Sequence, residues 1–174
     1  HVTMSWQGGT TDASAGVNKL KMALLLGDEH LLAEFGRLQN SYTKSQYKNI
    51  LKHAEGMKRG DKDSFKRFEK ELSDGLSREK FQSIHFKSER DSESGNNLIE
   101  FRIAGGEDYQ NMYPQIVKAV VRYATIMKAG YQEDAYRNDY VAAVSRILRK
   151  SQEIDPKRLK NLETVLHPVI DSAK

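Results

Sequence analysis

The sequence has no cysteine among its 174 residues, only three prolines and a single tryptophan. Without cysteine there is no disulfide scaffold, no thiolate zinc site and no cysteine nucleophile. This absence fits a reducing compartment, so a cytoplasmic location is expected. The apolar runs are all short, as in Ala23 to Leu26 with the preceding Met22, and none could form a membrane span or a signal peptide. P-loop, GxGxxG, HExxH and nucleophile-elbow motifs are also missing.

What remains is an ordinary globular composition, with 38% hydrophobic and 30% charged residues. At this length we expect residues 1–174 to form a single domain. The net charge of +4 permits phosphate or nucleic-acid ligands without requiring them. The chain begins His1-Val2-Thr3-Met4. Either it is a processed or excised piece of something longer, or His1 to Thr3 were added ahead of a native Met4.

Hydrophobic periodicity predicts an α+β fold. Alternation over 1–6, 81–87 and 98–103 predicts two or three short strands, and the polar stretch 88–97 indicates an antiparallel pair. We therefore expect a small antiparallel or mixed sheet covered by five or six helices, with a helical C-terminal half. Helical spacing is found over 17–35 (with a bend or restart at Gly27-Asp28), 40–57, 62–72, 113–127 (stopped by Gly130), 134–150 and 156–170.

The strand 98–103 is the most informative segment for chemistry. Glu100 and Arg102 lie on one face, about 7 Å apart along the strand, opposite Ile99, Phe101 and Ile103. A glutamate can ligate Mg²⁺, and an arginine can bind phosphate or carboxylate through two hydrogen bonds. Spacing alone favours a more ordinary interpretation, in which the strand faces solvent and carries a cross-strand ion pair.

Histidines and lysines supply the other candidate groups. His85 could approach Glu100 across an antiparallel pair, although an exposed strand histidine is favoured. His1, with Thr3 and Ser5, forms the polar face of the first strand and is a plausible ligand position if native. The basic run Lys44 to Lys70 is diluted by acidic residues, which favours a solvated helix face over a nucleic-acid surface.

Three segments together resemble the carboxylate–amine ligase superfamily, which includes glutamine synthetase and glutamate–cysteine ligase. The likeness is to its amidoligase branch, found in bacteria and phages, and it extends over roughly residues 1 to 130. The segments are His1-Val2-Thr3-Met4-Ser5, similar to the family's histidine strand; Arg37 to Lys44, similar to its Arg/Asn-Ser-Tyr segment; and Ile99-Glu100-Phe101-Arg102, similar to its Glu-x-Arg strand.

The resemblance implies an ATP-dependent ligase that joins a carboxylate to an amine through an acyl phosphate, with an amino-acid-like substrate. It places His1 and Glu100 near Mg²⁺ and assigns Arg102 to a phosphate or the substrate carboxylate. Arg37 and Lys44 would face the phosphates of ATP. The family carries further metal ligands on earlier strands. The chain would then be the C-terminal portion of a larger catalytic domain, inactive without a missing N-terminal segment or partner subunit.

Two alternatives stay open. The chain could be a non-enzymatic helical interaction protein, such as a phage or virion component, with an apolar patch on its last two helices. It could instead bind nucleic acid through the basic run, which requires a contiguous basic surface. The substrate and the oligomeric state are left open by the sequence.

Overall fold

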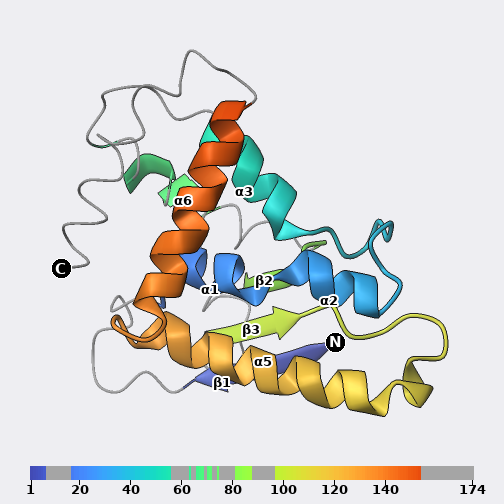
Figure 1. The fold of residues 1–174 in the computed structure, drawn as a ribbon. Helices are drawn as coiled ribbons and strands as arrows, with labels where there is room; N and C mark the ends of the chain where they lie inside the picture. Colours follow the sequence, from blue (N-terminus) through green and yellow to red (C-terminus); the bar gives the residue numbers. More distant parts are fainter. Residues whose placement is uncertain are drawn as a thin grey trace.

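The computed structural model describes residues 1–6, 17–55, 63, 66–68, 70–71, 74, 81–87 and 97–153. Within these residues the fold is α+β, as expected, with a three-stranded sheet and a helical C-terminal half (Figure 1). The elements are β1 (Val2–Trp6), α1 (Lys19–Leu26), α2 (Asp28–Glu34), α3 (Gln46–Glu55), β2 (Ile84–Lys87), β3 (Asn97–Phe101), the 3-10 helix η2 (Tyr109–Asn111), α5 (Tyr113–Tyr131) and α6 (Arg137–Glu153).

The sheet has the order β1-β3-β2, and both pairings are antiparallel. The Glu-x-Arg strand β3 is therefore central, and its two neighbours β1 and β2 are separated in the sequence by α1, α2 and α3. In register, Glu100 lies opposite Thr3 of β1 and His85 of β2. This placement puts the polar positions of all three strands on the same face of the sheet.

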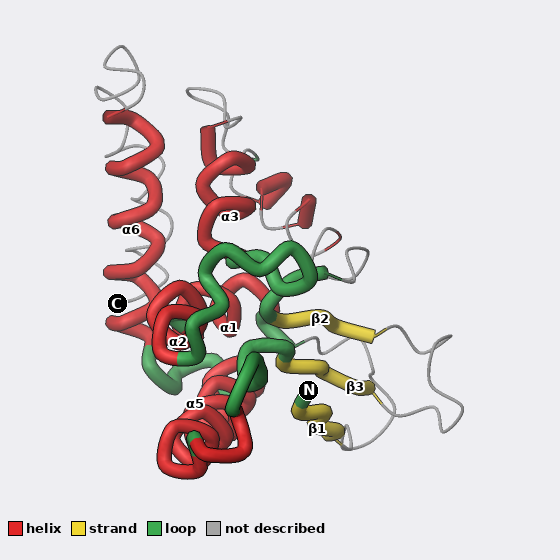
Figure 2. Tube along the Cα trace, turned by 90° about the vertical axis from the view of Figure 1, so that its right-hand side faces the viewer, coloured by secondary structure: helices red, strands yellow, loops and turns green. Residues whose placement is uncertain are grey.

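The opposite face of the sheet forms the core. Its inward residues on β2 and β3 are almost completely buried, and α1, α2 and α5 lie on one side of the sheet (Figure 2). Phe101 stacks on Tyr123 of α5, with ring centroids 4.1 Å apart and planes 5° from parallel. The buried sheet residues are Ile84, Phe86, Ile99 and Phe101.

The expected interruption at Gly27-Asp28 is confirmed, because α1 ends there and α2 begins. Gly27 has a φ of +62°, the left-handed conformation that favours glycine at a helix C-terminus. Arg122 of α5 donates to the last carbonyls of α1, at 2.8 Å to Leu25 and 2.7 Å to Leu26. These hydrogen bonds tie the end of α1 to α5 at the interruption.

The expectation that Gly130 stops the helix before it is wrong, since α5 continues to Tyr131. Gly130 is instead a point of close helix packing. A Cβ atom there would lie 2.6 Å from the Sδ atom of Met22 and 2.9 Å from Val17. The absence of a side chain at this position lets α1 and α5 approach each other. Close helix packing, and not helix termination, therefore explains the glycine.

The strand predicted over 81–87 is shorter in the structure, because its first residues pair with a loop and not with β3. Only Ile84–Lys87 of 81–87 forms the strand β2. The preceding residues pair with the loop after α2, through a parallel bridge between Lys44 and Gln82. The predicted helix 156–170 and much of 62–72 lie outside the described residues. No helix in the described part of the chain is long and apolar enough to cross a membrane.

Candidate functional site

The polar face of the sheet brings together three of the predicted site residues. His1 precedes β1, Glu100 lies in β3 and Arg102 follows it. The Nδ1 atom of His1 lies 2.9 Å from Oε1 of Glu100, and Nη2 of Arg102 lies 3.2 Å from Oε2. Each oxygen of the carboxylate therefore has its own basic partner. The antiparallel register produces this cluster, because Thr3 opposite Glu100 places His1 at the level of Arg102.

This carboxylate is buried, with Glu100 only 6% exposed. Arg102 is largely covered, whereas the side chain of His1 is half exposed. The solvent-facing strand that spacing alone favours is therefore wrong at Glu100. The exposed position favoured for His85 is wrong too, because His85 is buried at its register position opposite Glu100. Packing buries both polar positions, which the strand pattern by itself does not show.

Arg37 also reaches this end of the sheet, but it contacts the main chain. Its Nη1 donates to the carbonyls of Arg102 at 2.7 Å and Ile103 at 3.1 Å, and its Nη2 donates to the Thr43 hydroxyl at 2.8 Å. A Cβ atom on Gly105 would lie 3.1 Å from Nη1, so a glycine with φ +144° leaves room for the guanidinium. This geometry is that of a positioning residue, which fixes the backbone where β3 ends.

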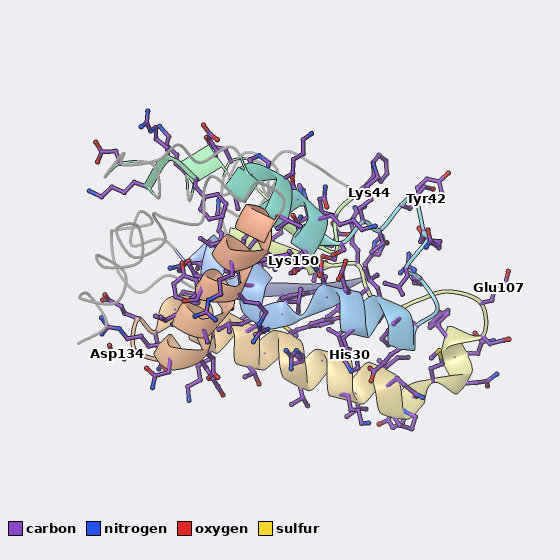
Figure 3. The ribbon with its side chains drawn as sticks, turned by 45° about the horizontal axis from the view of Figure 1, so that its top comes forward. His30, Tyr42, Lys44, Glu107, Asp134 and Lys150 are labelled. Atoms are coloured by element: carbon purple, nitrogen blue, oxygen red, sulfur yellow. The ribbon has the colours of Figure 1, made fainter. Side chains whose placement is uncertain are left out.

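Lys44 lies at the same end of the molecule, on the loop between α2 and α3. Its backbone N–H donates to the Phe81 carbonyl at 2.8 Å, and its carbonyl accepts from Ser83 N–H at 2.8 Å. The residue itself is exposed, and Figure 3 shows it beside Tyr42 at the edge of the molecule. The structure thus brings His1, Glu100 and Arg102 into contact and places Lys44 nearby without a direct side-chain contact to them.

Asp28 is a buried carboxylate near the site, and it is less exposed than Glu100. From the sequence it is predicted only as the residue where a helix bends or restarts. It is 2% exposed. It accepts hydrogen bonds from Ser45 Oγ at 3.0 Å, from Gln46 N–H at 2.5 Å and from Ser83 Oγ at 2.5 Å. Burial raises the pKa of Asp28 above its ordinary value, and these hydrogen bonds partly oppose the rise. Its partners are distant in sequence, so no local pattern predicts it.

The chemistry of this cluster suits an anionic ligand. The Nε atom of Arg102 is a buried donor with no acceptor among the described residues. A buried donor normally has a partner, and a phosphate or carboxylate oxygen would supply one. Glu100 holds Nη2 and so fixes the direction in which the guanidinium points.

A magnesium ion fits only together with such a ligand. The described residues contain no group of three or more His, Cys, Asp or Glu side chains able to hold a metal. Mg²⁺ in proteins is commonly held by one or two carboxylates together with substrate phosphates and water. Glu100 could be one of those carboxylates. An imidazole is a poor magnesium ligand, so the contact of His1 with Glu100 better suits a hydrogen bond that orients the carboxylate.

No protein-family model, no curated protein and no solved structure matches this chain.

Proposed function

We propose that this chain carries part of the active site of an ATP-dependent carboxylate–amine ligase. In this reaction a substrate carboxylate attacks the γ-phosphorus of ATP, which gives an acyl phosphate and ADP. An amine then attacks the acyl carbon, so that an amide forms and phosphate leaves. The observation that supports the proposal is the contact of His1, Glu100 and Arg102, at 2.9 Å and 3.2 Å, on one sheet face.

In this proposal Arg102 binds the transferring phosphate or the substrate carboxylate. Both are oxyanions that accept charge-assisted hydrogen bonds from the N–H groups of a guanidinium. Glu100 occupies Nη2, which leaves the buried Nε to meet the ligand. A fixed positive charge where negative charge is transferred is the usual contribution of a protein to phosphoryl transfer.

The other residues support this centre. Arg37 holds the carbonyls of Arg102 and Ile103 and so fixes the backbone from which the Arg102 side chain extends. Lys44 provides an exposed cation toward the phosphates. Mg²⁺ would neutralise the phosphates, held mainly by their oxygens with Glu100 as a protein ligand. Further acidic ligands would come from an N-terminal segment or a partner subunit, and the substrate would be a small amino-acid-like carboxylate.

An interaction role has one observation in its favour. Tyr113, Val117 and Val121 of α5 are exposed and recur every four residues, so they form an apolar stripe on one helix face. The interaction hypothesis expects the patch on the last two helices rather than on α5. It also expects a polar sheet face with no unusual cluster of charged groups. That face instead carries the buried Glu100 in contact with two basic side chains. We therefore place it second.

The nucleic-acid alternative depends on the basic run. Lys44, Lys48 and Lys52 are exposed. Residues 56–62 of the run lie outside the described part of the chain. Binding to an oligonucleotide that weakens steeply with salt would favour this alternative, because phosphate contacts release counterions.

The first test is binding of MgATP, measured as a thermal shift. At a nucleotide concentration of about a hundred times Kd, binding adds roughly 2.7 kcal/mol, or about 5 to 10 °C for a chain of this size. We expect Arg102→Lys to lose most of the shift. Arg149→Lys, a matched change at an exposed position of α6, should keep it. A wild-type protein that shows no shift would contradict the proposal.

The second test is chemical. Hydroxylamine traps an acyl phosphate as a hydroxamate, so the protein from the complete reading frame is incubated with MgATP, hydroxylamine and a panel of amino acids. We expect hydroxamate and ADP in equal amounts, reduced at least about ten-fold by Arg102→Lys. ADP release without hydroxamate for every carboxylate tried would rule out carboxylate activation.

A further inference from the structure

Two aromatic side chains stand exposed beside Lys44. Tyr42 is 68% exposed and Phe81 is 51% exposed. Their ring centroids lie 5.9 Å apart with planes at 70°, an edge-to-face pair. Large aromatic rings are usually buried when they serve the core. This pair, which we call the Tyr42–Phe81 platform, instead presents ring surface to the outside.

The backbone of the platform is held by hydrogen bonds. The N–H of Tyr42 donates to Oδ1 of Asn40 at 2.8 Å, which fixes the turn before it. Lys44 pairs with Phe81 and Ser83 at 2.8 Å each. The two rings therefore extend from backbone that is already held by hydrogen bonds. A ligand that binds them does not have to order this part of the chain, so the entropic cost of binding is small. Such preorganisation favours binding.

The platform lies at the Arg102 end of the sheet. Thr43, which follows Tyr42, has its hydroxyl 3.3 Å from the Arg102 carbonyl. Lys44 pairs with Ser83, whose carbonyl in turn accepts from Arg102 N–H at 2.9 Å. Lys44 and Arg102 are thus two strand spacings apart, about 10 Å between backbones. The exposed aromatic pair, the exposed Lys44 and Arg102 therefore lie on adjacent backbone segments at this end of the sheet.

We propose that the Tyr42–Phe81 platform stacks the base of the nucleotide, with its phosphates directed past Lys44 toward Arg102. Aromatic rings recognise the π-face of a nucleobase, and the two cations match the charge of the phosphates. The choice of ATP as the nucleotide rests on the proposed function. The same chemistry would accept a single-stranded nucleic acid, and the test separates the two sources.

The experiment is isothermal titration of the chain with MgATP, magnesium tripolyphosphate and a single-stranded oligonucleotide. Loss of stacking on one ring weakens base binding by roughly ten-fold. We expect Tyr42→Ala and Phe81→Ala to weaken MgATP binding by about that factor and to leave tripolyphosphate binding within about two-fold. Tyr42→Phe should bind MgATP as the wild type does.

Tyr136→Ala is the matched control. Tyr136 is also an exposed tyrosine, and Asp134, two residues before it, lies at the opposite end of the molecule from Tyr42 (Figure 3). We expect this variant to bind MgATP and tripolyphosphate as the wild type does. Thermal unfolding of each variant without ligand confirms that it is folded.

The outcomes separate the inference from the function it builds on. Platform variants that bind MgATP as tightly as the wild type overturn the inference and leave the proposed function standing. Binding that depends on the platform, without hydroxamate formation, overturns the ligase and supports the inference. A wild-type chain that does not bind MgATP overturns both. An oligonucleotide that binds far more tightly than MgATP, and depends on Tyr42, overturns ATP as the ligand.

Discussion

Asp28 and Glu100 are both buried carboxylates, at 2% and 6% exposure, and both lie near the same end of the sheet. Their partners differ in kind. Asp28 accepts from two hydroxyls and a backbone N–H, all neutral donors. Glu100 lies between an imidazole and a guanidinium.

Asp28 has the partners of a structural carboxylate, and we propose that the basic partners of Glu100 belong to a ligand site. The donors to Asp28 come from the start of α3 and from the residue before β2, so the carboxylate joins α2 to both. The partners of Glu100 keep unused capacity, since His1 is half exposed and Arg102 has a buried Nε without an acceptor in the described chain. The described partners of Asp28 are all groups of the protein, whereas the Glu100 cluster keeps one donor, Arg102 Nε, for the ligand that we propose.

The largest effect is expected from Asp28→Ala. Three donors would lose their acceptor, and each buried unsatisfied group costs about 1 to 3 kcal/mol. We expect the free energy of unfolding to fall by roughly 3 kcal/mol in urea denaturation. Asp139→Ala, at an exposed position of α6, should change it by less than about 0.5 kcal/mol. Equal effects of the two changes would contradict a structural role for Asp28.

A smaller loss is expected from Arg37→Lys. A lysine ammonium cannot reproduce the fork that reaches two carbonyls and a hydroxyl. We expect about 1 to 2 kcal/mol of lost stability. MgATP should also bind more weakly, because the backbone of Arg102 is released. A variant that loses nucleotide binding with unchanged stability would show that Arg37 contacts the ligand instead.

The titration of Asp28 is expected to have a smaller effect on the free energy of unfolding, in a direction that its pKa shift determines. Because burial raises its pKa in the folded state above the ordinary 3.8, the folded state binds more protons than the unfolded state in that window. Wild-type stability, relative to the non-titrating Asp28→Asn, should therefore fall as pH rises from 3.8 through the raised pKa. Urea denaturation of both proteins across this range measures it. A relative stability that increases with pH would show that hydrogen bonding outweighs burial.

The smallest effect on stability is expected from changing both members of the Glu100–Arg102 pair. Replacement of a buried ion pair by apolar residues is often neutral. We expect Glu100→Leu with Arg102→Met to change the free energy of unfolding by no more than about 1 kcal/mol and to abolish the MgATP shift. Arg102→Met alone should destabilise more, because Glu100 stays buried with one partner fewer. If the double variant retains the MgATP shift, the cluster is structural.

Alternation along the strands was enough to predict the fold class and the shared face of Glu100 and Arg102. It could not predict that β1 borders β3, because that pairing joins residues almost a hundred positions apart. The same limit applies to Asp28, whose partners lie at 45, 46 and 83. Gly130 shows a second limit: a glycine that closes a helix and one that admits a neighbouring helix look alike in sequence.

The most direct measurement is the NMR resonance of the Arg102 Nε–H, assigned by its absence in Arg102→Lys and followed during titration with MgATP. A donor that gains a phosphate or carboxylate acceptor forms a charge-assisted hydrogen bond, which moves its proton downfield. We expect a saturable downfield shift of this resonance, with the Arg149 Nε–H unchanged. An Arg102 resonance that does not move while MgATP binds would contradict the assignment of this cluster as the phosphate site.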